Sequence, residues 1–219
     1  MPLLKVDLLT LLNNCKYITT LIQNFDIDVL GVSDHVLNQC YEAIAAKSKS
    51  MVVVPRAVFE SSQNILLPKT FELRTRLYAC IPRDLATARS LAKLSGTYTI
   101  ALRVDTVKFI DENEINLLAQ VKTRKFIEVH LYSFTELLKH EEKRASTERL
   151  LYLLSETIER ALRRDIPVVV SSASPRLDQT LHPNQMDILL FSLGFSKRER
   201  RMMLEIYPME LLLVWREWS

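Results

Sequence analysis

The chain has 219 residues, 48% of them hydrophobic, and its 29 Lys and Arg against 26 Asp and Glu give a net charge of +3. This length suits one sizeable core, so we expect a single domain over residues 1–219. No apolar run approaches the roughly 18 residues that cross a bilayer, and Asp7 comes too early for a signal peptide. We therefore expect a soluble, cytoplasmic protein with no membrane partner. Mild basicity permits nucleic-acid binding without requiring it.

The order of segments along the chain favours an α/β barrel. Short β-branched apolar runs alternate with stretches of helical period, as in repeated βα units around a parallel sheet. Runs such as Val52-Val53-Val54 are apolar throughout, which is typical of strands buried on both faces. We expect a TIM-barrel-like domain with about eight βα units. The strands are predicted at residues 4–9, 27–32, 51–54, 77–81, 98–104, 107–110, 126–132 and 167–171.

Three residue pairs have the capping-box spacing that marks a helix start, because a Ser or Asp side chain can accept from the third helical amide. The pairs are Asp111 with Glu114, Ser133 with Glu136, and Ser196 with Glu199. The helix that begins at Ser133 should stop before Pro167, with a break in the polar stretch 140–146. Within the stretch 54–71 we find no clean period, and we predict a long loop or irregular insertion there.

Three short helices are expected after the last strand. Pro183 and Pro208 lie where a proline can open a helix without losing a hydrogen bond, and Gly194 is a natural stop between two helices.

The three cysteines show no pairing signal in the sequence. Cys15, Cys40 and Cys80 are odd in number, widely spaced and include no CxxC pair. We therefore interpret all three as reduced residues that pack in the interior.

Motifs for catalysis are scarce. With only three glycines, the chain cannot assemble a GxxxxGK[ST] loop or a GxGxxG fingerprint, and its four histidines lack metal-ligand spacing. Ser171-Ser172 end a predicted strand without a GxSxG elbow or an identifiable base. We interpret these hydroxyls as partners of backbone groups in a strand-end turn.

Several carboxylates lie in or just after predicted strands, where barrel enzymes collect their catalytic groups. They are Asp7, Asp28, Asp34, Asp105 and Glu128. We interpret them as helix caps or partners of arginines, and we expect no catalytic residue and no metal in this chain. A metal-dependent phosphoesterase-like barrel enzyme stays open as an alternative.

Basic residues gather in clusters that can neutralise RNA phosphates, although each could equally be a solvated helix end. The strongest cluster opens a helix at Lys197, where cations oppose the helix dipole. Arg160, Arg163 and Arg164 suit a helix C-terminus and need no other explanation. We predict that Arg176 and the Lys197 cluster share one rim of the barrel. The candidate RNA-binding residues are Arg176, Lys197, Arg198, Arg200, Arg201, Lys122, Arg124 and Lys125.

The last third of the chain follows a recognisable order: a strand ending in Ser-Ser and a small residue, a proline-opened helix, a Leu-Gly turn and a closing helix with Tyr-Pro. This order resembles archaeal ribonuclease P protein component 3, the homologue of the eukaryotic thirty-kilodalton subunit. Arg144 with Ala145 also resembles the family's Arg-Ala pair. The matching positions are Ser171, Ser172, Ala173, Pro183, Gly194, Pro208 and Arg144. Leu181 departs from the pattern, because the family tends to have arginine there.

The resemblance implies a PHP-type barrel, related to metal-dependent phosphoesterases but without their metal site. It implies a subunit of the ribonuclease P holoenzyme, an endoribonuclease in which the catalytic RNA, with Mg²⁺, removes the 5′ leader of precursor tRNA. The implied partners are ribonuclease P RNA, protein component 2 and the other ribonuclease P proteins, with precursor tRNA contacted indirectly. No cofactor is expected on the protein itself. A protein-interaction scaffold without RNA contact is the second alternative.

Overall fold

The computed structural model describes residues 4–25, 27–47, 51–61, 76–139 and 144–218. In this part of the chain, seven strands form one parallel sheet in which each pairs with its neighbours in sequence. The sheet curls into a nearly closed barrel, so the expected TIM-barrel-like α/β fold is confirmed, with seven strands in place of eight. The strands are β1 (Val6–Thr10), β2 (Val29–Ser33), β3 (Val52–Ser61), β4 (Leu77–Pro82), β5 (Thr99–Leu102), β6 (Phe126–His130) and β7 (Val168–Ser171).

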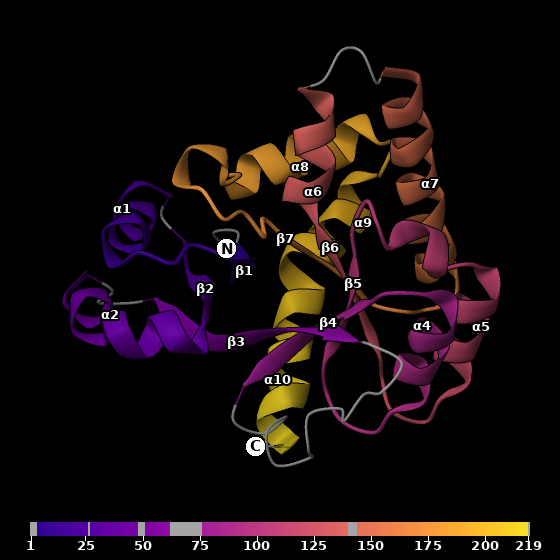
Figure 1. Cartoon of the computed structure of the whole chain (residues 1–219), viewed down its shortest axis with the longest axis horizontal. Coiled ribbons are helices and arrows are strands. Elements are labelled where there is room, and N and C mark those ends of the chain that lie inside the picture. Colours follow the sequence, from indigo (N-terminus) through magenta and orange to yellow (C-terminus); the bar gives the residue numbers. More distant parts are fainter. Residues whose placement is uncertain (1–3, 26, 48–50, 62–75, 140–143, 219) are drawn as a thin grey trace.

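Helices cover the outside of the barrel (Figure 1). One pair, α1 and α2, lies on one side of the molecule, and α4, α5 and α7 lie on the other, with the strands between them. The helices are α1 (Cys15–Phe25), α2 (Asp34–Lys47), α4 (Leu85–Lys93), α5 (Glu112–Gln120), α6 (Leu131–Leu138), α7 (Arg144–Arg163), α8 (Pro183–Ser192), α9 (Lys197–Arg201) and α10 (Tyr207–Trp218). Shorter turns are η1 (Val107–Phe109), η3 (Leu177–Gln179) and the π-turn η4 (Met202–Ile206).

One strand prediction and part of one loop prediction were wrong. Residues 107–110 form the turn η1 and its cap instead of a strand, because the Thr106 hydroxyl donates to Ala101 O at 2.9 Å and turns the chain back after β5. The predicted loop at 54–71 begins instead as a continuation of β3, which pairs with β4 up to Ser61. The remainder of that stretch, residues 62–71, lies outside the described residues.

Two of the three capping predictions are confirmed. The Asp111 side chain accepts from Glu114 N at 2.8 Å, and Ser196 with Glu199 forms a reciprocal capping box. The third is wrong, because α6 begins at Leu131 and the Ser133 hydroxyl donates to His130 O at 2.8 Å. The expected break is present, since α6 ends at Leu138 and α7 begins at Arg144; residues 140–143 lie outside the described part.

The helical segments after β7 differ from three separate helices. Pro183 opens α8 and Gly194, at φ 95°, follows its end, as expected. The helix α9 then continues through η4 into α10, where Pro208 is the second residue. A proline cannot donate to the carbonyl four residues back and its ring crowds that carbonyl, so the wider π-turn precedes it.

A side chain closes the seam between β1 and β7, where no strand ladder forms. The buried carboxylate of Asp7 accepts from Ser172 N at 2.9 Å and from the Ser172 hydroxyl. Beyond it, Ala173 N donates to Leu9 O at 2.9 Å. Ala173 has φ 48°, which costs least for small side chains, and this explains the small residue after Ser-Ser.

The end of the barrel at which the strands begin, hereafter the base, is closed by α10. Tyr207 and Leu211 of α10 are buried in one apolar cluster with the first residues of four strands, and Trp215 packs against it. The cluster's strand residues include Val6, Val29, Leu77 and Phe126. Trp215 therefore helps to close the base of the barrel.

The cysteine interpretation was wrong for two of the three residues. Cys15 and Cys40 form a disulfide with a Cα–Cα distance of 5.2 Å, whereas Cys80 is free and buried. Their separation of 25 residues hid the pairing. The helices α1 and α2 pack side by side against residues of β2 and β3, which brings the first residue of α1 against the middle of α2.

Candidate nucleic-acid interface

The middle of the barrel holds a buried ion pair. Arg56 of β3 and Glu128 of β6 are both fully buried, and the Arg56 guanidinium donates to the Glu128 carboxylate. Glu128 also accepts from Thr99 and, at 2.6 Å, from Ser171. Gly31 makes room for this pair, because a Cβ there would lie 2.8 Å from Arg56 Cγ and 1.7 Å from Leu8 O.

The charge states of this interior group follow from burial. Burial alone would raise the pKa of Glu128, but Arg56 and the two hydroxyls hold it below its ordinary value. Burial lowers the pKa of His130 to about 4. At neutral pH, His130 is therefore an uncharged neighbour of a carboxylate whose charge is matched by Arg56.

Three of the strand-end carboxylates, Asp34, Asp105 and Glu128, pair with arginines as interpreted, whereas Asp28 and Asp7 accept hydrogen bonds from a backbone amide and from Ser172. Asp34 pairs with Arg76 at 3.3 Å and Asp105 with Arg103 at 3.1 Å, while Asp28 accepts from Lys5 N at 2.7 Å. Asp7 and Glu128 are occupied inside the barrel wall. Across the described ranges, no three His, Cys, Asp or Glu side chains are grouped to hold a metal ion.

The Ser171 and Ser172 hydroxyls have partners that the sequence did not suggest. Both side chains are fully buried, and they donate to the carboxylates of Glu128 and Asp7 rather than mainly to backbone groups. An alcohol that donates to a buried carboxylate and has no access to solvent cannot attack a substrate. These serines are structural.

The predicted RNA-binding cations fall at both ends of the barrel. Arg176 follows β7 and is bound in bidentate fashion by Asp178, at 3.1 and 3.0 Å. The α9 cluster lies instead at the base, where Arg200 and Lys197 line a hollow with Lys5 and Asp28, residues that precede β1 and β2. The prediction that Arg176 shares a rim with α9 is therefore wrong, because α8 carries the chain back across the barrel.

Several of these cations already have partners. Arg200 donates to Asp187 at 2.7 Å and to Phe195 O at 2.8 Å, and Arg201 pairs with Glu205 at 3.2 Å. Arg124 pairs with Glu210 of α10.

Lys125 is buried and cannot reach RNA. Its ammonium donates to Leu94 O and lies 4.5 Å from the centre of the Tyr98 ring. Burial lowers its pKa to about 8. Its inclusion among RNA-contacting residues is therefore corrected, and it instead ties the end of α4 to β6.

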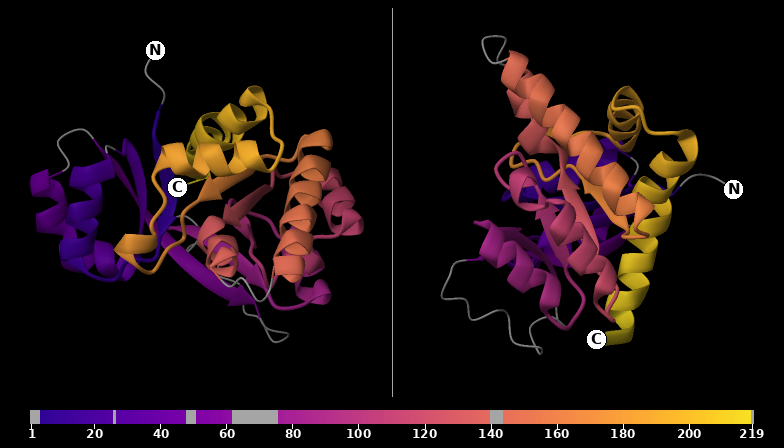
Figure 2. Two further views of the ribbon diagram at one scale, coloured as in Figure 1. Left: turned by 90° about the horizontal axis from the view of Figure 1, so that it is seen from above. Right: turned by 90° about the vertical axis from the view of Figure 1, so that its right-hand side faces the viewer.

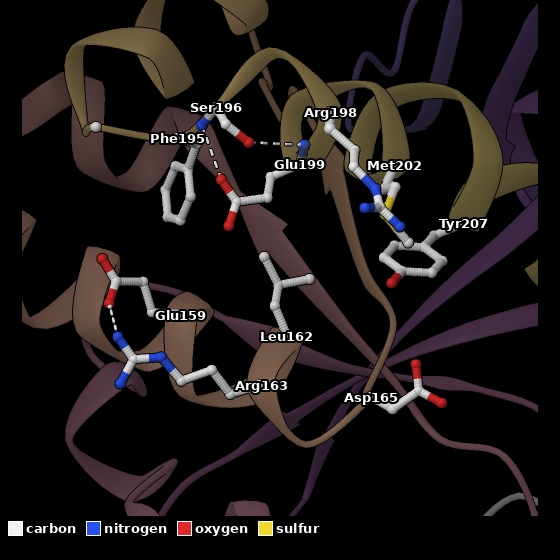
Figure 3. Close-up of a pocket in the computed structure, with 11 residues that line it drawn as sticks. Glu159, Leu162, Arg163, Asp165, Phe195, Ser196, Arg198, Glu199, Met202 and Tyr207 are labelled. Carbon is white, nitrogen blue, oxygen red and sulfur yellow. Dashed lines mark hydrogen bonds and ion pairs between the residues drawn. The ribbon is translucent and has the colours of Figure 1, made fainter.

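A groove of about 580 Å³ opens at the base between α7 and α9 (Figure 3). We call it the α7–α9 groove. One wall is the end of α7 with Glu159 and Arg163, and the opposite wall carries Arg198 and Glu199. Its lining also includes Leu162, Phe195, Met202 and Tyr207. The Arg198, Met202 and Tyr207 side chains are drawn on the same side of the groove (Figure 3).

Two features of the site escaped the sequence analysis. Arg56 lay in the stretch interpreted as a loop, and its only local signal was the apolar run directly before it. Arg163 was explained as a helix-end cation, but the fold also places it in the wall of the α7–α9 groove.

The fold and this groove, which carries both arginines and carboxylates, define a class of protein, a seven-stranded α/β barrel whose described interior includes a buried ion pair and hydrogen-bonded serines. Comparison with known structures identifies a protein of similar fold. The chain is similar to one in the cryo-EM structure of archaeal ribonuclease P with mature tRNA, with a TM-score of 0.67, 16% sequence identity, and coverage of 93% of this chain and 87% of that one. No protein-family profile matches the sequence, and no curated protein does. In the described part of the chain, every helix is too short or too polar to cross a membrane.

Proposed function

We propose that this chain is a protein subunit of ribonuclease P, corresponding to protein component 3. The observation that carries the proposal is the structural similarity to a chain of archaeal ribonuclease P, which extends over 93% of this chain. The Ser-Ser-Ala strand end, the helix opened by Pro183 and the Tyr-Pro pair at Pro208 support it from the sequence. In this role the chain assists the catalytic RNA in removing the 5′ leader of precursor tRNA.

The interior of the barrel supports a non-catalytic role for the chain. Its carboxylates and strand-end serines are occupied by one another and by Arg56, as a packed core requires. The chemistry then belongs to the RNA and its Mg²⁺ ions, and the protein provides cationic surface that offsets phosphate repulsion. Protein component 2 is the partner with which we expect it to pair, alongside the other ribonuclease P proteins.

Reconstitution tests this proposal. Ribonuclease P RNA, the remaining archaeal ribonuclease P proteins and precursor tRNA are combined with Mg²⁺, with and without this chain. We expect 5′-leader cleavage to be faster, or to need less Mg²⁺, when the chain is present, and the chain alone to cleave neither precursor tRNA nor simple phosphate esters. Cleavage that is unaffected by the chain would contradict the proposal.

Cleavage by the chain alone would favour a barrel phosphoesterase instead. In that case Asp7→Asn and Glu128→Gln variants would identify the residues responsible.

A further inference from the structure

Three basic segments that are far apart in the sequence meet at the base of the barrel. The loop with Lys122 and Arg124 directly precedes β6, and the end of α7 directly precedes β7. Parallel neighbouring strands begin at the same end of a barrel, so these two loops are adjacent. Arg124 lies 3.9 Å from Asp165, and Asp165 lines the α7–α9 groove together with Arg198. The surface is therefore continuous from α9 to the loop before β6.

The acidic side chains of this surface are largely occupied. Glu159 pairs with Arg163 at 2.9 Å, and Glu199 accepts from Ser196 N at 2.8 Å in the helix cap. Glu210 is paired with Arg124. Asp165 is exposed, and among the described residues its ion-pair partner is Arg124 at 3.9 Å.

Three cations of the same surface remain available. Lys122, Arg164 and Arg198 are exposed, and within the described residues none of them has a side-chain partner. They are free to take an external anion, whereas Arg200 and Arg201 of the same helix are committed to Asp187 and Glu205. The sequence alone could not show that Arg198 is without an ion-pair partner among the described residues while Arg200 and Arg201 have one.

The shape of the surface suits a phosphodiester chain. The α7–α9 groove has a volume of about 580 Å³, its apolar lining includes Leu162, Met202 and Tyr207, and Arg163 and Arg198 come from its opposite walls. Phosphate contacts need cations spaced along a surface, without a deep apolar pocket. An acidic protein segment is the competing occupant, and it would leave the salt response to RNA unchanged.

We infer that the α7–α9 groove and the loop before β6 form one binding surface for RNA phosphates, with Arg198, Arg164 and Lys122 as the contacting cations. This inference rests on the proposed function and adds to it the face of the subunit that is turned toward RNA. Arg176 and Arg201 take no part.

The test compares two triple variants with the same loss of charge. The base variant is Lys122→Gln, Arg164→Gln, Arg198→Gln, and the control variant is Arg83→Gln, Arg176→Gln, Arg201→Gln. Arg83 pairs with Glu60 beyond the strand ends opposite the base. Binding of the full-length protein to transcribed archaeal ribonuclease P RNA is measured over a salt series, and melting temperatures confirm that both variants fold.

We expect the base variant to bind about a hundredfold more weakly at 0.1 M salt, with a slope of log affinity against log salt that is lower by about 2. The control variant should bind as the wild type does. Equal binding by the base variant and the wild type would overturn the inference but leave the proposed function standing. Normal RNA binding with lost assembly with another ribonuclease P protein would also overturn it, since the surface would then be a protein interface. A wild-type chain that neither binds this RNA nor stimulates cleavage would defeat the proposed function itself.

Discussion

At the scale of single residues, the barrel is organised around buried charges. The Arg56–Glu128 pair replaces part of the apolar filling that a barrel interior usually has. Two guanidinium nitrogens of Arg56 have no hydrogen-bond partner among the described residues. An ion pair in this environment contributes little net stability, but breaking it leaves a buried charge without compensation.

We therefore expect Arg56→Met to lower the free energy of unfolding by about 3–5 kcal/mol. The double variant Arg56→Met, Glu128→Gln should recover most of that loss, because no charge remains in the interior. Urea denaturation of the wild type, both single variants and the double variant measures this coupling. Additive losses in the double variant would show that the two residues do not depend on each other.

Asp7 gives a prediction about pH. Burial raises its pKa to about 6, against hydrogen bonds from Ser172 and Leu9 that lower it. The folded state therefore holds the proton more tightly than the unfolded chain does. This contribution to stability is complete below pH about 4 and is lost as the pH rises through about 6.

The Asp7→Asn variant lacks this titration. Its stability relative to the wild type should rise by roughly 3 kcal/mol between pH 4 and pH 7, the equivalent of about two pKa units. Thermal or urea unfolding at several pH values measures the difference. Asp105→Asn is the matched control, because it removes an exposed carboxylate, and its effect on stability should be less than about 1 kcal/mol.

At the scale of elements, the disulfide joins α1 and α2, which pack in an apolar cluster separate from the one at the base. It closes a segment of 25 residues that spans α1, β2 and the first half of α2. A disulfide that closes a segment of this length lowers the conformational entropy of the unfolded chain, and this stabilises the folded state.

Replacing Cys15 and Cys40 with serine should lower the free energy of unfolding by about 3 kcal/mol under non-reducing conditions. Adding a reductant to the wild type should give a similar loss and should leave the variant unchanged. The Cys80→Ala variant is the control, because it removes the free thiol and keeps the disulfide, so its stability should still fall when a reductant is added. A wild type that is insensitive to reductant would indicate that the bond contributes nothing to stability.

The sequence predicted those elements whose signals are local. Six of the seven strands were found because each is a short run made mostly of apolar residues, and β3 was found only in its first part. Its continuation carries Pro55 and Arg56, residue types that argue against a central strand. Ser133 failed as a cap because the chain turns directly from β6 into α6.

The sequence predicted which basic residues could belong to the candidate interface, but not which of them are available to bind RNA. The basic clusters are visible in the sequence, but which cations are free depends on distant partners such as Glu210 for Arg124 and Asp187 for Arg200. The burial of Lys125 likewise follows from the end of α4, 31 residues away. The meeting of α7, α9 and the loop before β6 is a consequence of barrel closure.

At the scale of the whole molecule, the barrel depends on its last helix. Figure 2 shows α10, in yellow, along one flank of the molecule, next to the lower end of α7. Its buried face completes the apolar cluster at the base, which the strands alone would leave open to water.

Two leucines of α10 test this dependence. Leu211 is fully buried and Leu213 is 60% exposed, so the same change on the same helix should have different effects. We expect Leu211→Ala to cost about 2–5 kcal/mol and Leu213→Ala less than about 0.5 kcal/mol. Chemical denaturation measures both. Similar losses at the two positions would mean that helix propensity, and not closure of the base, sets the cost.

The π-turn η4 lets α9 and α10 direct their side chains independently, although the two helices are continuous. Tyr207 N reaches back five residues to Met202 O, so the turn holds one more residue than an α-helical turn. Relative to a continuous α-helix, the side chains of α9 are therefore rotated about the helix axis by roughly a quarter of a turn with respect to those of α10. Arg198 can thus face the groove while Leu211 faces the barrel. Deleting one residue between Met202 and Ile206 would bring the two halves back into phase, and a correctly seated α10 would then aim α9's cations in another direction.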